Sequence, residues 1–222
     1  MSIGSSPGCS AVPPERGRLF GRLLAAVLGL ALSTVGARAG ILLEGRLENQ
    51  PLRVELADDG ARALGEVDGR RYLLELRRGE VFRLGADGTR RRLAAGGDDG
   101  ATLDGYRLES WSPGPPVAGY GSVYNVLQRG ETICAEVLSS RWMKRFAEPL
   151  VRAVTLLQRV ETALRPRPRG ACGRAAFATY ARNGWPLMVG YRDRLIFVTE
   201  TLRFGHPVRV PGSSGGHGTT SP

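Results

Sequence analysis

Two cysteines, Cys134 and Cys172, are the residues of this chain whose type and spacing point most directly to chemistry. Redox and metal-binding cysteines usually stand in C-x-x-C pairs or near histidines, and neither arrangement occurs here. An even pair of cysteines in an oxidising compartment is best explained as one disulfide. In the chain-entropy model, closing a loop of this length stabilises a fold by about 4 kcal/mol. We therefore expect a structural bond between Cys134 and Cys172.

The sequence offers little to a catalytic mechanism. The two histidines, His206 and His217, stand at or beyond the end of the expected fold, so its body lacks an imidazole base or ligand. Ser122 follows a Gly-Tyr-Gly turn without a histidine partner, and Asp58-Asp59 occupies a turn, where Asp usually accepts backbone N–H groups. Motifs for phosphate or zinc are also missing. We expect a non-enzymatic protein with no cofactor and no metal.

The N-terminus has the pattern of a signal peptide. Arginines precede the apolar run Leu23 to Leu32, and Ala37-Arg38-Ala39 supplies a small-x-small cleavage site. The run is shorter than the ~20 residues of a membrane-spanning helix, so an uncleaved anchor is the less favoured interpretation. We expect residues 1–39 to be removed after Ala39 and the mature protein to be secreted into the periplasm.

The chain is basic, with a formal net charge of +10. Lys144 is its only lysine. The excess of arginine is typical of a compositional bias of the whole sequence and not of one basic patch on the surface. Export argues against nucleic acid as a partner, whereas peripheral contact with an anionic membrane surface stays open. In a strand, Arg91 points away from Arg90 and Arg92, so this triplet is typical of a solvated edge strand.

Residues 41–139 alternate between apolar and polar side chains for most of their length, as in Leu52, Val54 and Leu56. Turn pairs recur every nine or ten residues and set strands of about seven residues. This pattern predicts an antiparallel meander. Residues 95–119 are expected to be loop-like around one short strand, 105–111, and a second hairpin pairs 122–128 with 131–138. The expected turns of the first meander are Asp59-Gly60, Asp68-Gly69, Arg78-Gly79 and Asp87-Gly88.

The apolar period changes to three and four residues after position 149, which predicts a helix over about 149–164. Ser140 is expected to cap a separate helical turn, with a bend before Pro149. A short second helix is expected over 172–182, ended by Asn183-Gly184. A hairpin of 186–191 and 194–204 closes the chain. Leu150, Val154, Leu157, Val160 and Leu164 form the apolar stripe of the long helix, while Arg152, Gln158, Arg159 and Glu161 are assigned to or near its polar face.

The fold class predicted from these elements is α+β. Seven or more antiparallel strands must bury one face, and the long helix is the only element that can cover it. We expect a strongly curved sheet, a half-barrel meander, covered by one long amphipathic helix and a short second helix. One domain is expected over 40–204. Residues 205–222, rich in Gly, Ser, Thr and Pro, are expected to be a disordered tail.

Three segments of the sequence resemble those of a known family: GEVDGRRYLLELRRGEVFRLGADGTRRRL, YNVLQRGETICAEVLSS and NGWPLMVGY. With the export signal, they resemble a family of bacterial secreted proteins of unassigned function. That family is distantly similar to the periplasmic lipoprotein-localisation factors. The resemblance implies an unclosed β-barrel with helices across its open side and an apolar interior for acyl chains. It includes no catalytic motif and matches no individual ligand-binding residue.

Two functions follow as expectations. The first is an exported envelope protein that binds a lipid, an acyl chain or a lipoprotein between curved sheet and helix. The alternative is a periplasmic module with a filled core that binds another envelope protein. Trp and Met adapt well to irregular apolar ligands, although core packing explains the same residues. The ligand-pocket candidates are Trp142, Met143, Phe146, Leu150, Val154, Leu157, Trp185 and Met188.

Overall fold

The structure, a computed structural model, describes residues 40–93, 105–165, 172 and 175–208. All of these residues belong to one unit of the chain, Arg38–Pro222. The predicted signal peptide and the predicted tail from residue 209 onward lie outside the described residues.

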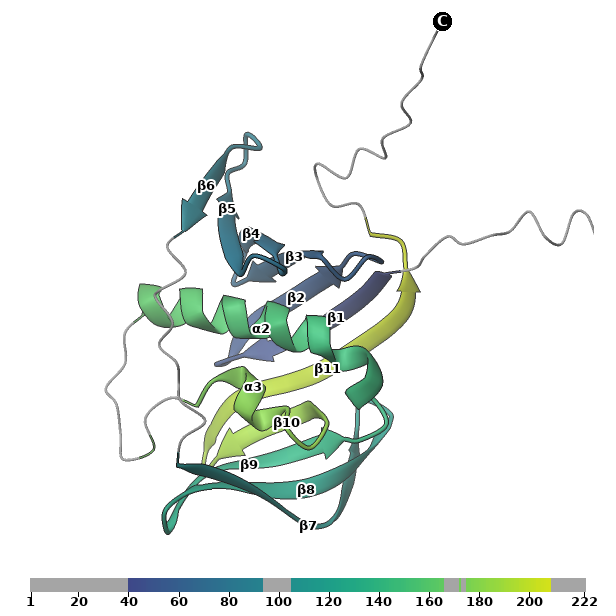
Figure 1. The fold of residues 1–222 in the computed structure, drawn as a ribbon, viewed down its shortest axis with the longest axis vertical. Coiled ribbons are helices and arrows are strands. Elements are labelled where there is room, and N and C mark those ends of the chain that lie inside the picture. The colour runs from purple at the N-terminus through teal and green to yellow at the C-terminus, as the bar shows by residue number, and fades with distance from the viewer. Residues whose placement is uncertain (1–39, 94–104, 166–171, 173–174, 209–222) are drawn as a thin grey trace, which may run out of the picture. The chain divides into compact units, whose positions relative to one another are not determined.

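The described residues form one unclosed antiparallel sheet of 11 strands with two helices. Two sequential meanders, β1 to β6 and β7 to β11, are joined by pairing of β1 with β11, so β6 and β7 form the two edges (Figure 1). The first meander consists of β1 (Gly40–Leu47), β2 (Gln50–Leu56), β3 (Arg62–Val67), β4 (Arg70–Glu75), β5 (Glu80–Leu84) and β6 (Arg90–Leu93). The second consists of β7 (Tyr106–Val117), β8 (Tyr120–Arg129), β9 (Thr132–Ser140), β10 (Trp185–Tyr191) and β11 (Arg194–His206).

The first meander turns at the four predicted positions. Asp68 and Gly69 both have positive φ, 51° and 74°, which a two-residue hairpin loop between right-twisted strands requires. One further hairpin was not predicted. Glu48 and Asn49 connect β1 to β2 with φ of 51° and 66°, although neither is glycine. Asn tolerates this region better than most residues, so Asn49 was the weak signal of a turn.

Strand β7 corrects the prediction of a short strand followed by a loop. It continues to Val117, through Pro113, Pro115 and Pro116. Proline cannot donate a backbone hydrogen bond, but β7 is an edge strand with a neighbour on one side only, so these positions tolerate it. The register with β8 shifts twice along the strand, which is how it accommodates the irregular sequence.

The long helix α2 runs without interruption from Lys144 to Leu164, with Pro149 inside it. The prediction of two segments was therefore wrong. Ser140 is the last residue of β9 instead of a cap, and Met143 stands at the N-cap position without a side-chain cap bond. Packing of the apolar face on the sheet offsets the backbone bond that a proline removes.

Helix α2 crosses one face of the sheet (Figure 1) and contacts β2, β3 and β10. Gly65 in β3 permits this close approach, because a Cβ atom there would stand 2.8 Å from Cδ2 of Leu157. Leu150, Val154, Leu157 and Val160 are buried as predicted, whereas Leu164 is 48% exposed. The apolar stripe therefore meets the sheet along most of its length and leaves it at the C-terminal end.

Helix α3 is shorter than expected and covers Phe177–Tyr180. The backbone N–H of Phe177 donates to Oε1 of Gln158 at 2.8 Å, and Nε2 of Gln158 donates to the Ala175 carbonyl. Gln158 is thus buried against α3, contrary to its assignment to the polar face of α2. Gly184 has a φ of 146°, so the predicted left-handed cap does not form.

The closing hairpin turns at Arg192-Asp193 as predicted, and β11 extends to His206, two residues into the predicted tail. Cys134 and Cys172 form the predicted disulfide, with their Cα atoms 5.5 Å apart. The bond ties β9 to the segment between the two helices. Neither described helix has the length and apolar character that crossing a membrane requires.

Candidate functional site

The eight predicted pocket residues divide into two groups. Met143, Leu150, Val154, Leu157 and Trp185 are buried and belong to one hydrophobic core between helix and sheet. Trp142, Phe146 and Met188 are instead exposed at the surface, by 64%, 48% and 37%. The structure therefore does not bring the eight residues together around one site.

The buried group is packed against other core residues. The ring of Trp185 lies 5.7 Å from that of Phe177 and 5.8 Å from that of Phe197, each in edge-to-face geometry. Its indole Nε1 donates to Oγ1 of Thr199 at 3.0 Å, so its polar group is satisfied inside the core. Trp185 acts here as a core residue.

Of the exposed group, Met188 is separate. It alternates with the buried Leu187 and Val189 in β10, so it lies on the opposite face of the sheet from them. Trp142 and Phe146 instead lie together, with their ring centroids 5.9 Å apart. Trp142 stands just before α2, and Phe146 lies in its first turn.

Two further rings complete what we call the aromatic cluster: Tyr120, Trp142, Phe146 and Phe204. Phe204 is 5.7 Å from Phe146 and 6.5 Å from Trp142, in edge-to-face contacts. Tyr120 stacks on Trp142 at 6.5 Å. Phe204 is 43% exposed, so three of the four rings, those of Trp142, Phe146 and Phe204, are largely exposed to solvent. This is the main exposed apolar feature formed by several elements of the described chain.

The fold explains why the cluster is uncovered. Leu202 and Phe204 point to the same face of β11, but only Leu202 is buried. The sheet therefore continues past the N-terminal end of α2, and Phe204 lies on this uncovered part. Tyr120 reaches it from the β7–β8 turn, where Ala118 and Gly119 have positive φ, and its hydroxyl donates to the Leu202 carbonyl at 3.2 Å.

Sequence reasoning missed Tyr120 and Phe204 as members of the site. The cluster joins a turn, a helix start and a strand end that are far apart in the sequence. No local pattern indicates that such segments meet. The only signal was the type of the residues, because aromatic side chains are enriched at interaction surfaces.

A small cavity lies beside α2. A cavity of about 10 Å³, at the lower limit for a single water molecule, is lined by Gln158, Glu161 and residues of β1 and β2. A shallow open depression of about 470 Å³ crosses the other face of β3 to β6. Arginines and carboxylates line it together. Its lining residues are Asp59, Ala61, Arg62, Leu73, Glu75, Arg77, Arg78, Glu80, Phe82 and Arg90.

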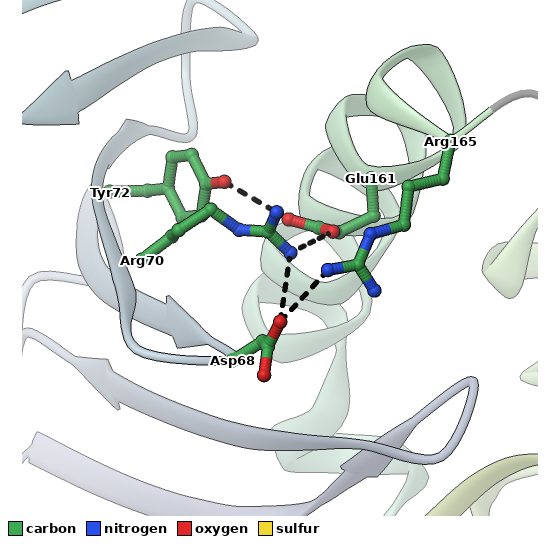
Figure 2. A network of polar contacts seen from close by, with 5 residues as sticks. All are labelled: Asp68, Arg70, Tyr72, Glu161 and Arg165. Carbon is green, nitrogen blue, oxygen red and sulfur yellow. Dashed lines mark hydrogen bonds and ion pairs between the residues drawn. The ribbon is translucent and has the colours of Figure 1, made fainter.

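A polar network joins the C-terminal end of α2 to the β3–β4 turn (Figure 2). Glu161 accepts from Arg70 at 2.7 Å and from the hydroxyl of Tyr72 at 3.0 Å. Arg165 donates to Asp68 at 2.8 Å, and Asp68 also lies 3.7 Å from Arg70. The side chain of Glu161 is only 11% exposed, so it is not on the solvated face to which it was assigned. The network fixes the helix on the sheet.

Burial, and secondly the Glu161 carboxylate, raise the pKa of Tyr72 to about 12 from its ordinary value of 10.0. The neutral phenol is therefore favoured in the folded state. The contribution of this phenol to the free energy of unfolding is complete below pH 10, the ordinary pKa of tyrosine. It is lost as the pH rises through 12, where the phenol of the folded state ionises. We expect the stability difference between wild type and Tyr72→Phe to be about 1 kcal/mol at pH 8 and to shrink as the pH approaches 12. Urea unfolding at several pH values measures this difference, and one that stays constant would contradict the role given to Tyr72.

The arginine triplet forms the edge strand β6, as expected, and all three side chains are exposed. Arg92 pairs with Glu80 at 2.7 Å on the neighbouring strand. In the described part of the chain, no group of three or more His, Cys, Asp or Glu side chains is arranged to hold a metal ion.

Comparisons of the chain with known protein families, with curated proteins and with solved structures found no match.

Proposed function

We propose that this protein is a non-enzymatic binding module of the cell envelope, and that the aromatic cluster is its contact surface. One observation carries the proposal. Trp142, Phe146 and Phe204 are 64%, 48% and 43% exposed, yet they contact one another across two elements. Contiguous exposed apolar groups are typical of interaction sites, and tryptophan is prominent among residues that dominate binding energies.

An exported location for the module is supported by the disulfide, which is consistent with an oxidising compartment outside the cytoplasm. Cleavage after Ala39 and a periplasmic destination are part of the same proposal.

We further infer that the sheet is strongly curved, in the manner of a half-barrel. Three strand spacings separate β8 from β11 in the strand order, which in a flat sheet is about 14 Å. The hydroxyl of Tyr120 nevertheless reaches the Leu202 carbonyl. A bend of the second meander toward the face that carries α2 accounts for this bond.

A ligand held between sheet and helix is less well supported than a surface contact. Pockets for small hydrophobic ligands usually have volumes of roughly 300–1,000 Å³. Met143, Leu150, Val154, Leu157 and Trp185, which would line such a pocket, are each no more than 3% exposed and pack in the core. The packed interior favours the interaction module over the carrier.

Site-directed photocrosslinking in the producing cells tests this function. A photoreactive phenylalanine analogue is placed at Phe146 and, as a matched control, at Trp111, which is 62% exposed but lies in β7 outside the aromatic cluster. We expect envelope adducts, of protein or of lipid, from position 146 and few from position 111.

Equal yields at the two positions, or none at position 146, would overturn the proposed surface. Lipid that co-purifies stoichiometrically and stays bound to a Trp142→Ser/Phe146→Ser variant would instead support the internal ligand.

A further inference from the structure

We infer that the aromatic cluster docks on the surface of an anionic phospholipid bilayer. This inference rests on the proposed function and names the partner of the same surface. It has two supports, which are the chemistry of the rings and the charges beside them.

The rings of the cluster suit the boundary between water and lipid. Trp and Tyr concentrate at this boundary because each has an apolar ring and one polar group. Trp142 is 64% exposed, and Tyr120 stacks on it with its hydroxyl bonded to the Leu202 carbonyl. Phe146 and Phe204 add apolar area beside them. A shallow insertion of these rings buries their area without the deep groove that a peptide or acyl chain requires.

Positive charge accompanies the cluster. Arg141 and Lys144 flank Trp142 in the sequence, and both are exposed. Without residues 1–39, which contain four arginines and one glutamate, the 31 basic and 21 acidic residues fall to 27 and 20, a formal net charge of +7. Anionic headgroups attract such side chains within about a Debye length, whereas a neutral bilayer does not. The pairing of exposed rings with cations therefore favours anionic phospholipid over a neutral apolar partner.

Vesicle binding by the protein purified from the envelope fraction tests the inference. The probes are vesicles of phosphatidylcholine alone and of phosphatidylcholine with phosphatidylglycerol. We expect binding to the anionic vesicles that falls at least about tenfold in the Trp142→Ser/Phe146→Ser variant. The matched variant Trp111→Ser, which changes an equally exposed tryptophan outside the cluster, should bind as wild type does.

Two further measurements locate the contact. Brominated phosphatidylglycerol should quench tryptophan fluorescence in wild type and in Trp111→Phe, and the quenching should be lost in Trp142→Phe. Lys144→Gln should weaken binding to anionic vesicles about fivefold and leave neutral vesicles unaffected. Thermal melting of each variant checks that it is folded.

Each contrary result has a distinct meaning. Equal binding to neutral vesicles, no binding to either, or quenching at Trp111 instead of Trp142 would overturn the bilayer as partner. If vesicle binding is absent while crosslinks from position 146 reach a protein, the proposed function stands and this inference fails. If position 146 yields no crosslinks at all, both are wrong.

Discussion

Replacement of Leu157 by Asp is expected to unfold the domain at neutral pH. Leu157 is fully buried in the core and lies directly over Gly65, so a carboxylate at this position is removed from water. An unpaired buried charge costs several kcal/mol, which is comparable to the whole stability of a domain. Circular dichroism and urea unfolding measure the result.

The matched control for this prediction is Leu164→Asp, on the same helix but 48% exposed, which should change the stability by less than about 1 kcal/mol. A graded variant, Leu157→Ala, should cost roughly 2–5 kcal/mol. A much smaller cost of Leu157→Ala would indicate vacant space beside the helix. That result would argue for an internal ligand and against the filled core.

The elements predicted well are those whose signals are local. Asp68-Gly69 determines a hairpin by its own backbone preferences, and Leu150 to Val160 determine a helix face by their spacing. The helix start was predicted less well. Ser140 has the chemistry of a cap, yet pairing with Trp185 keeps it in a strand, so tertiary contacts overrode the local signal.

The features that escaped prediction depend on contacts between distant segments. Gln158 and Glu161 are polar residues of a helix whose flanks happen to be covered, by α3 and by the β3–β4 hairpin, so their burial is not visible in the helix alone. The aromatic cluster forms because Phe204 at the end of β11 meets Phe146 in the first turn of α2, and because Tyr120 reaches Trp142 from the β7–β8 turn. Sequence periodicity reports which face of an element is apolar. It does not report where the covering element stops.

Removal of the disulfide, by Cys134→Ala together with Cys172→Ala, is expected to lower the free energy of unfolding by about 4 kcal/mol. The two cysteines are separated by 38 positions, and the closed loop contains all of α2. Breaking the bond gives the unfolded chain more conformational freedom, which lowers the free energy of unfolding. For a domain of this size the loss corresponds to a melting temperature lower by roughly 8–16 °C.

Reduction of the wild-type protein is the control that separates the bond from the packing of its sulfur atoms. Cys134 is 8% exposed and packs in the core, so alanine also removes apolar contacts there. If the bond matters, the reduced wild type and the double variant should have similar stabilities. A reduced protein as stable as the oxidised one would show that the bridge does not restrain the unfolded chain.

The position of the bond also predicts what its loss leaves intact. Cys172 follows the C-terminal end of α2, and its carbonyl accepts from the hydroxyl of Tyr106 in β7. The aromatic cluster lies at the other end of α2, where Phe146 contacts Phe204 without help from the bridge. At temperatures where the double variant is still folded, its binding to anionic vesicles should therefore equal that of wild type. If the double variant lost vesicle binding as well as stability, α2 would be held on the sheet mainly by the disulfide, and not by the buried stripe from Leu150 to Val160.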